Sequence, residues 1–309
     1  MTRAERIAAF LARTGWSAAG RTPLAADASA RRYERLIEGE RRCVLMDAPP
    51  PEDVGAFVRT AGLLRGLDLS APVVLAAELD AGLLLLEDFG DGVFARLLDD
   101  GVPPQPLYDL AVDALIALHR RFETADGLPD YDLARFLDQL ALYPELFGGD
   151  RDAFLDAWRA PLETALAGPR SLLLRDYHVG NLMLLSTREG VAQCGLLDFQ
   201  DAGPGPCAYD LASLVEDARR DVAPAVRDRC LERYRAALPL DLEGLATLAA
   251  MRHVRVLAVF ERLARVGRPG YLAHAPRVRR LLAAHLAKPP LAAVSRWFER
   301  FPPAGPAAP

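Results

Sequence analysis

Apolar positions in the first part of the chain alternate between helical spacing and strand spacing. Over residues 2–13 they recur at helical spacing behind a threonine-glutamate capping box, and over residues 52–67 they do so again. Short apolar runs bounded by turn residues predict four strands, at residues 32–36, 42–46, 73–78 and 82–87. This part of the chain is therefore expected to form a strand-rich lobe with one internal helix.

Beyond Phe89 the helical spacing dominates. Residues 107–122 form a strong amphipathic pattern. Further helices are expected within residues 136–166, 206–238, 242–266 and 276–286. In the first of these segments, breaks are expected at Pro144 and near Gly148. Two apolar runs, at residues 171–174 and 195–197, lie among the helices, and charged residues follow each run at once.

The change of pattern predicts two lobes. A chain of 309 residues is long for a single compact core. We expect a strand-rich N-terminal lobe over residues 1–88 and a helical C-terminal lobe over residues 89–301. Residues 302–309 are rich in proline, alanine and glycine and are predicted to be disordered.

Composition narrows the class of protein. Hydrophobic residues make up 51% and charged residues 26%, which is typical of a soluble globular enzyme. The net charge of -5 offers little attraction to a phosphate backbone, so a nucleic-acid partner is not expected. The four cysteines are dispersed, and no run reaches the roughly 18 apolar residues of a membrane span. We therefore expect a cytoplasmic protein that does not bind membranes.

The strongest chemical signal lies at residues 172–183, which read Leu-Leu-Leu-Arg-Asp-Tyr-His-Val-Gly-Asn-Leu-Met. Asp176 directly follows an apolar run, and Asn181 comes five residues later. Asp198 lies seventeen residues beyond Asn181, in a second apolar run that continues Leu-Leu-Asp-Phe-Gln-Asp. This spacing is typical of the catalytic loop and the metal loop of kinase-fold enzymes.

Phosphoryl transfer explains these residue types. It requires a carboxylate to accept the proton of the acceptor hydroxyl and a metal ion to spread the developing charge. Magnesium prefers oxygen ligands, and one carboxylate and one amide oxygen suit it together with the phosphates of ATP. We therefore predict that Asp176 is the base and that Asn181 and Asp198 bind Mg²⁺.

An upstream run at residues 83–90, Leu-Leu-Leu-Leu-Glu-Asp-Phe-Gly, resembles the last N-lobe strand and the hinge of such enzymes. On this interpretation, the backbone between Glu87 and Phe89 hydrogen-bonds the edge of adenine. A buried edge strand with no role in binding is the alternative, and the sequence leaves it open.

These motifs resemble the aminoglycoside phosphotransferase and choline kinase-like superfamily. Within it, the chain is similar to the bacterial kinases that phosphorylate N-acetylmuramate and N-acetylglucosamine at C1 during cell-wall recycling. The stretches that carry the resemblance are residues 27–33 with 44–50, 175–183, 197–211 and 252–263. The resemblance implies an α+β, bilobal protein-kinase-like fold with a small strand-rich N-lobe and a larger, mainly helical C-lobe. It also implies an ATP-dependent sugar kinase.

The resemblance also implies further site residues. Residues 27–32 would cover the ATP phosphates, which makes Ser29, Arg31 and Arg32 nucleotide contacts. Arg252 and His253 would contact the acceptor sugar. From their places in the catalytic and metal loops, His178 is expected to contact the acceptor sugar or the phosphate, and Asp201 the sugar. For each of these four a local structural role is the alternative, and Asp201 is also a candidate metal ligand. Asp210 near the start of a helix is expected to brace the catalytic loop.

The chain departs from the family pattern in ways that keep other functions open. Leu174 stands where a histidine is common, and Met46 stands where a strand lysine usually grips the phosphates. Arg31 or Arg32 is expected to supply that charge. The alternatives are a nucleotide-binding protein without activity and a kinase for another alcohol or an aminoglycoside-like acceptor. A protein kinase is disfavoured, because only residues 200–206 separate the metal loop from the next helix. The oligomeric state is not predicted.

Overall fold

The computed structural model describes residues 1–24 and 31–301. The chain divides into two compact units. The first comprises Met1–Val102 and Gly180–Asp201, and the second comprises Pro103–Val179 and Ala202–Pro309. Ser29 and the tail predicted to be disordered lie outside the described residues.

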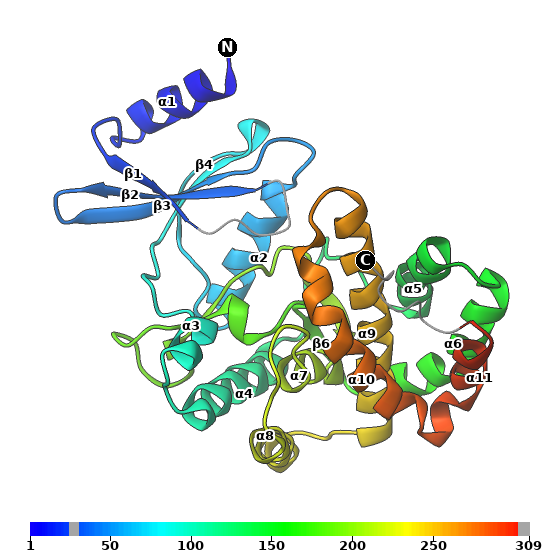
Figure 1. Cartoon of the computed structure of the whole chain (residues 1–309). Coiled ribbons are helices and arrows are strands. Elements are labelled where there is room, and N and C mark those ends of the chain that lie inside the picture. The colour runs from blue at the N-terminus through cyan, green and yellow to red at the C-terminus, as the bar shows by residue number, and fades with distance from the viewer. Residues whose placement is uncertain (25–30, 302–309) are drawn as a thin grey trace. The chain divides into compact units, whose positions relative to one another are not determined.

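A five-stranded antiparallel sheet with the strand order β1-β2-β3-β5-β4 is the centre of the first unit (Figure 1). Its strands are β1 Gly20–Pro23, β2 Arg32–Glu38, β3 Arg41–Asp47, β4 Val74–Glu78 and β5 Leu83–Leu86. The four strands expected from the apolar pattern are confirmed. Between β2 and β3 the register pairs Glu38 with Arg41, which leaves a tight turn at Gly39, whose φ of 61° suits glycine.

Two of the helices in the first unit are longer than ten residues. Helix α1 (Arg3–Arg13) begins with the predicted capping box at Thr2 and lays its apolar face on the sheet. The contacting core side chains include Ile7, Phe10, Leu11, Leu36, Cys43, Leu45, Leu83 and Leu85. Helix α2 (Val54–Gly66) begins at Asp53, whose carboxylate accepts from the backbone N–H of Ala56.

A hairpin distant in sequence also belongs to the first unit. Strands β7 (Leu182–Leu184) and β8 (Cys194–Leu196) pair with each other. Gly195 bridges to Ser70, and Met183 bridges to Val93, just before helix α3 (Phe94–Asp99). These pairings extend the first unit to Val102 and to residues 180–201, whereas the apolar pattern places the lobe boundary between residues 88 and 89.

Helices make up most of the second unit. They are α4 Pro104–Arg121, α5 Leu133–Phe147, α6 Arg151–Leu166, α7 Ala208–Val215, α8 Pro224–Ala237, α9 Leu242–Arg265, α10 Ala275–Leu286 and α11 Ala292–Arg300. Helix α9 packs against α5, α6, α7 and α10 and carries much of the core (Figure 1). Strand β6 (Arg170–Leu173) pairs with β9 (Gly203–Pro206). The two units together contain the short 3₁₀ turns η1 Leu79–Ala81, η2 Val179–Asn181, η3 Gly190–Gln193, η4 Pro269–His274 and η5 Pro289–Leu291.

The break predicted at Pro144 is wrong. Helix α5 continues through this proline and ends at Phe147. A proline inside a helix costs about 3 kcal/mol, but α5 buries one face, which includes Phe136, Leu140 and Tyr143, in the core of the second unit. This tertiary packing outweighs the local penalty. The predicted break near Gly148 is confirmed, because Gly148 is the C-cap of α5.

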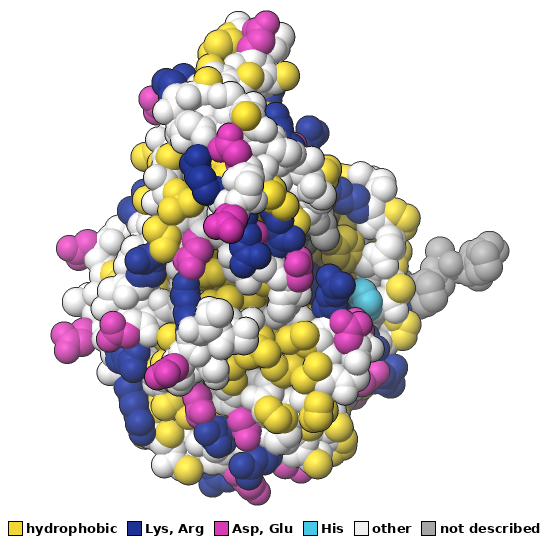
Figure 2. Space-filling model, turned by 90° about the vertical axis from the view of Figure 1, so that its left-hand side faces the viewer, with side chains coloured by type: hydrophobic (Ala, Val, Ile, Leu, Met, Phe, Trp, Pro, Cys, Tyr) yellow, Lys and Arg dark blue, Asp and Glu magenta, His cyan; other side chains and the backbone are white. Residues whose placement is uncertain are grey.

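On the face that Figure 2 shows, basic and acidic side chains are interspersed among apolar ones. No helix within residues 1–24 and 31–301 is long and apolar enough to cross a membrane.

Candidate active site

A buried carboxylate accepts hydrogen bonds from the backbone of the loop after β6. Asp210, in the first turn of α7, is fully buried and accepts from the backbone N–H groups of Leu174 (2.6 Å) and Arg175 (2.8 Å). Arg175 has a φ of 74°, an unusual value for a residue other than glycine. Strain of this kind clusters at functional sites. The expected bracing of this loop by Asp210 is confirmed.

Asp176 follows this strained residue and is half-buried. Burial opposes ionisation of the carboxyl, but surrounding positive charge outweighs burial and holds the pKa of Asp176 below its ordinary value. The side chains that lower this pKa are, in order, Arg255, Arg175, His178 and Arg252. The carboxylate is therefore ionised at neutral pH and able to accept a proton.

His178 lies in the same loop and is 4% exposed. Its Nε2 lies 2.8 Å from Nη1 of Arg219. Because arginine can only donate, Nε2 accepts and the ring proton resides on Nδ1. Burial lowers the pKa of His178 to about 4, although Asp217 raises it. His178 is therefore a neutral imidazole in a fixed orientation.

Within the first unit, the hairpin of β7 and β8 places Asn181 beside Asp198. Nδ2 of Asn181 lies 3.4 Å from Oδ2 of Asp198, and Nε2 of Gln200 donates to Oδ1 of Asp198 at 2.8 Å. Asp198 has a φ of 57°, a second strained residue within the motifs. The amide of Asn181 thus lies beside the carboxylate of Asp198, and carboxylate and amide oxygens are ligands that suit a hard cation such as Mg²⁺.

Arg31 supplies a positive charge to the same corner of the first unit. Its Nε donates to Glu52 at 2.8 Å, and its Nη1 lies 3.4 Å from Oδ1 of Asp198. Burial lowers the pKa of Arg31, but Tyr33, Glu52 and Asp198 outweigh burial and raise the pKa, so the guanidinium stays charged. The side chain of Met46, in the position where a lysine is common, is 1% exposed. Arg32 opens β2 and is exposed.

The segment after β5 has its own contacts. The backbone N–H of Glu87 donates to Val73 at 2.8 Å, and the guanidinium of Arg188 pairs with the Glu87 carboxylate and lies 5.2 Å from the ring centre of Phe89. Strand β5 lies between β3 and β4, so it is an interior strand. The alternative of an edge strand is therefore wrong.

The other predicted acceptor contacts lie in different surroundings. Asp201 is exposed. Arg252 is 2% exposed, and its Nη1 lies 3.5 Å from the carbonyl oxygen of Glu216. His253 is fully buried, and its Nε2 lies 2.8 Å from Oε2 of Glu216.

Glu216 also bonds His285, whose Nε2 lies 2.7 Å from the same oxygen. The ligating atoms of Glu216, His253 and His285 lie within 4.8 Å of one another, a spacing that a metal ion accepts. However, Nζ of Lys288 lies 3.3 Å from Nδ1 of His285, where a metal-bound imidazole needs an acceptor for its N–H group. Arg227 also pairs with Glu216, at 3.3 Å. We therefore interpret this cluster as a buried hydrogen-bond network, named here the Glu216 network.

Several of these neighbours are absent from the sequence-based set. They are Glu52, Gln200, Asp217, Arg219 and Arg255. One signal was available: the charged run at residues 216–221 directly follows the apolar helix α7. Gln200 bonds Asp198 two residues away, whereas Glu52 and Arg255 meet their partners only through tertiary structure.

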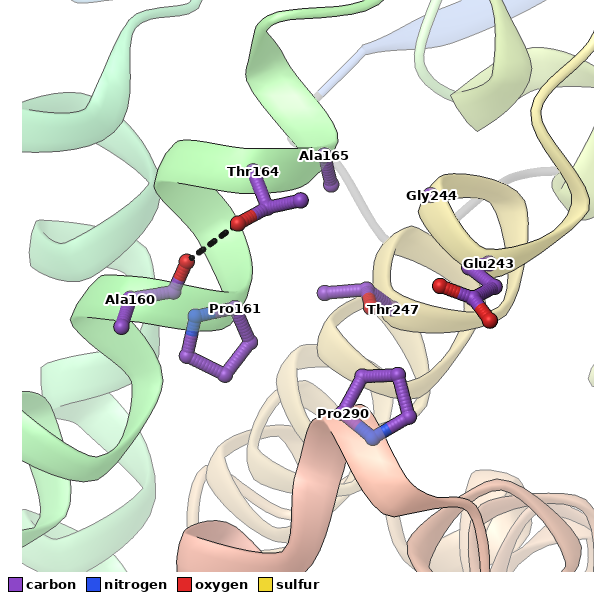
Figure 3. A pocket seen from close by; sticks show the side chains of 8 residues that line it. All are labelled: Ala160, Pro161, Thr164, Ala165, Glu243, Gly244, Thr247 and Pro290. Carbon is purple, nitrogen blue, oxygen red and sulfur yellow. Dashed lines mark hydrogen bonds between the residues drawn. The ribbon is translucent and has the colours of Figure 1, made fainter.

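A cavity of about 210 Å³ lies between α6 and α9 (Figure 3). Its lining is mostly small and apolar, and it consists of Ala160, Pro161, Thr164, Ala165, Glu243, Gly244, Thr247 and Pro290. The hydroxyl of Thr164 donates to the carbonyl oxygen of Ala160 at 3.1 Å. Ligand pockets usually reach roughly 300–1,000 Å³, and none of the predicted site residues lines this cavity.

Comparison with known proteins adds sequence and fold relationships. The profile of the phosphotransferase enzyme family matches residues 20–253. A protein of Caulobacter vibrioides named N-acetylmuramate/N-acetylglucosamine kinase is 38% identical, and the alignment covers 96% of each chain. A protein of Pseudomonas aeruginosa with the same name is 36% identical over 87% of this chain and 84% of its own.

A choline/ethanolamine kinase family protein from Mesorhizobium loti has a similar solved structure. Its TM-score is 0.65 at 16% identity, and the match covers 96% of this chain and 100% of that one. This likeness concerns the fold alone. It confirms the predicted α+β, protein-kinase-like fold class.

Proposed function

Because the chain belongs to the phosphotransferase enzyme family, we propose that it is an ATP-dependent sugar kinase acting on the anomeric hydroxyl of N-acetylmuramate and N-acetylglucosamine. The observation that carries this proposal is Asp176, an ionised carboxylate on a strained loop that Asp210 holds through two backbone hydrogen bonds. The names of relatives 38% and 36% identical supply the acceptor. Cell-wall recycling in the cytoplasm, where ATP is available, is the setting we propose.

Asp176 is proposed as the general base. Its carboxylate would accept the proton of the C1 hydroxyl as that oxygen bonds to the γ-phosphorus of ATP, while the bond from the γ-phosphorus to the β,γ-bridging oxygen breaks and ADP leaves. The lowered pKa of Asp176 keeps it ready to accept this proton. The hydrogen bonds from Leu174 and Arg175 to Asp210 fix the backbone just before the base, so that little reorganisation is needed during the reaction.

Asn181 and Asp198 are proposed to hold Mg²⁺, which when bound would neutralise charge on the phosphates. Arg31 is proposed as the phosphate-binding cation in place of the missing lysine, with Glu52 fixing its orientation. Arg32 and Ser29 are also proposed to contact the ATP phosphates. Since the N–H of Glu87 is already bonded to Val73, adenine would be bound by other backbone groups of Glu87 and Phe89.

For the acceptor, His178 is proposed as a contact with the sugar, its ring held by the bond between Nε2 and Arg219. Asp201 is exposed and is proposed as a further contact with the sugar. Arg252 and His253 are proposed to influence acceptor binding indirectly, since both are bonded to Glu216 and are almost inaccessible.

The test is an assay of the purified protein with ATP, Mg²⁺ and each amino sugar, with ³¹P NMR detection of the product. We expect a sugar 1-phosphate that requires both sugar and metal. Turnover of another alcohol without turnover of either amino sugar would remove the sugar assignment and leave the kinase assignment.

The missing strand lysine favours one competing function, a nucleotide-binding protein without activity. Met46 occupies the lysine position and is buried. This alternative predicts that ATP raises the melting temperature while no phosphoryl transfer occurs to any acceptor. The charge of Arg31 beside Asp198 is our reason for preferring an active kinase.

A further inference from the structure

Helix α9 carries two arginines one turn apart, Arg252 and Arg255. Side chains three residues apart share a helix face. Arg252 is 2% exposed and points a guanidinium nitrogen at the carbonyl oxygen of Glu216, at 3.5 Å. Arg255, by contrast, is only half-buried. The face of α9 thus carries one arginine committed to the interior and another that is partly exposed.

Other arginines around the catalytic loop already have contacts. Arg219 bonds His178 at 2.8 Å, and the guanidinium of Arg175 lies 5.2 Å from the ring centre of Tyr131. Within residues 1–24 and 31–301, Arg255 makes no hydrogen bond or salt bridge. Nevertheless, it is the charge that acts most strongly on Asp176. An arginine with these properties is available for an anion that arrives with the acceptor.

The two acceptors proposed above differ in one chemically decisive way. N-acetylmuramate carries a lactyl carboxylate, and N-acetylglucosamine carries a hydroxyl at the same position. A guanidinium presents a planar fork of N–H donors that matches a carboxylate. The same fork makes no comparable ionic contact with a neutral hydroxyl.

We propose that Arg255 binds the carboxylate of N-acetylmuramate and thereby sets the preference between the two amino sugars. This inference rests on the proposed function. It assigns the acidic substituent of the sugar to the half-buried face of α9, on the same compact unit as the base Asp176.

The test compares the two sugars on the same enzyme. In Arg255→Met, we expect the ratio of kcat/KM for N-acetylmuramate to kcat/KM for N-acetylglucosamine to fall by about 10- to 100-fold, the usual value of a hydrogen-bonded charge pair. Any effect that Arg255 exerts through Asp176 cancels in this ratio, because both sugars react with the same base. Arg255→Lys keeps the charge without the fork and should give a smaller fall.

The matched control is Arg262→Met, because Arg262 lies on the same helix and is exposed. This variant should leave the ratio as in the wild type, and thermal melting should show that both methionine variants fold. An unchanged ratio in Arg255→Met overturns the inference, as does a wild-type enzyme that accepts only the neutral sugar.

If the wild type phosphorylates neither sugar, the proposed function fails separately. Calorimetric binding of N-acetylmuramate to wild type and to Arg255→Met then decides the inference. We expect weaker binding to the variant by the same factor, and equal affinity for the two proteins overturns the inference.

Discussion

At the scale of single residues, the charge of Asp176 is the property on which the proposed chemistry depends. Positive neighbours hold its pKa below the ordinary carboxyl value of about 3.9. His178 has a pKa of about 4 and is likewise not titrated near neutrality. We therefore expect kcat/KM between pH 5 and 8 to show no limb from either residue. A pH–rate profile measured with saturating Mg²⁺ checks this, and a limb near pH 6 that disappears in His178→Gln would contradict it.

Replacing Asp176 by asparagine removes the proton acceptor and keeps the shape of the side chain. We expect kcat to fall by about 10²- to 10⁴-fold, the usual contribution of a general base, with ATP binding unaltered. Steady-state kinetics and nucleotide-induced melting shifts measure the two effects. The control is Asp156→Asn, because the side chain of Asp156 is 77% exposed. Turnover close to wild type in Asp176→Asn would refute the role of the base.

Arg31 is the residue on which nucleotide binding depends in this proposal. Its guanidinium is fixed by Glu52 and lies 3.4 Å from Asp198. In Arg31→Met we expect KM for ATP to rise by about 10-fold or more, because a charge-assisted contact with phosphate is lost. Arg59→Met, at an exposed site on α2, is the comparison variant. An ATP KM that is equal in all three proteins would mean that another group binds the phosphates.

At the scale of elements, the sequence predicts those helices and strands whose own residues carry a capping motif or an apolar alternation. The capping box at Thr2 predicts α1, and the alternation around Gly39 predicts β2 and β3. Strand β1 has four exposed residues and no apolar alternation, and it exists only through its pairing with β2. Its pattern therefore carried no signal.

The candidate site shows the same limit. Asp176, Asn181 and Asp198 belong to short motifs with characteristic spacing, so the sequence alone is enough to propose them as site residues. The ion pair of Arg31 with Asp198 joins residues 167 positions apart. Arg255 belongs to no motif, so a role for it can be inferred only once α9 is packed in the second unit. Such contacts depend on the tertiary fold, which single-sequence patterns do not specify.

The hydrogen bonds by which Asp210 holds the catalytic loop lead to a prediction for the pH dependence of stability. Burial raises the pKa of Asp210 to about 7, against the two backbone hydrogen bonds that lower it. A carboxyl whose pKa is raised by folding stabilises the fold most below its unfolded pKa, and this stability is lost as pH rises through the folded pKa. Relative to Asp210→Asn, the wild type should therefore lose stability between about pH 4 and 7, by at most about 4 kcal/mol.

Denaturant melts of both proteins at several pH values measure this difference. Asp210→Ala is the harsher variant, since it leaves the N–H groups of Leu174 and Arg175 without their acceptor. We expect it to lower stability by about 2–4 kcal/mol and to reduce kcat. A difference between wild type and Asp210→Asn that is constant across this pH range would show that the carboxyl is ionised throughout.

At the scale of the whole molecule, the Glu216 network joins three separate helices of the second unit. Glu216 is the C-cap of α7, His253 lies in α9 and His285 lies in α10. Burial opposes the charge of Glu216, but the hydrogen bonds of both histidines lower its pKa. For His253, burial itself lowers the pKa. Each lowered pKa contributes stability that is present near neutral pH. The contribution of His253 is lost as pH falls below about 6.5, and that of Glu216 is lost as pH falls below about 4.3.

Glu216→Ala should therefore destabilise the protein by about 3–5 kcal/mol at pH 7, which corresponds to a fall in Tm of roughly 10 °C. Glu232→Ala, at an exposed site on α8, should leave Tm unchanged. The same variants separate a hydrogen-bond network from a metal centre. If the cluster works without metal, neither EDTA nor added Zn²⁺ changes the Tm of the wild type. A zinc-dependent rise in Tm that His285→Gln abolishes would show instead that the two imidazoles and the carboxylate bind a metal ion, because a chelated ion stabilises only the fold that gathers its ligands.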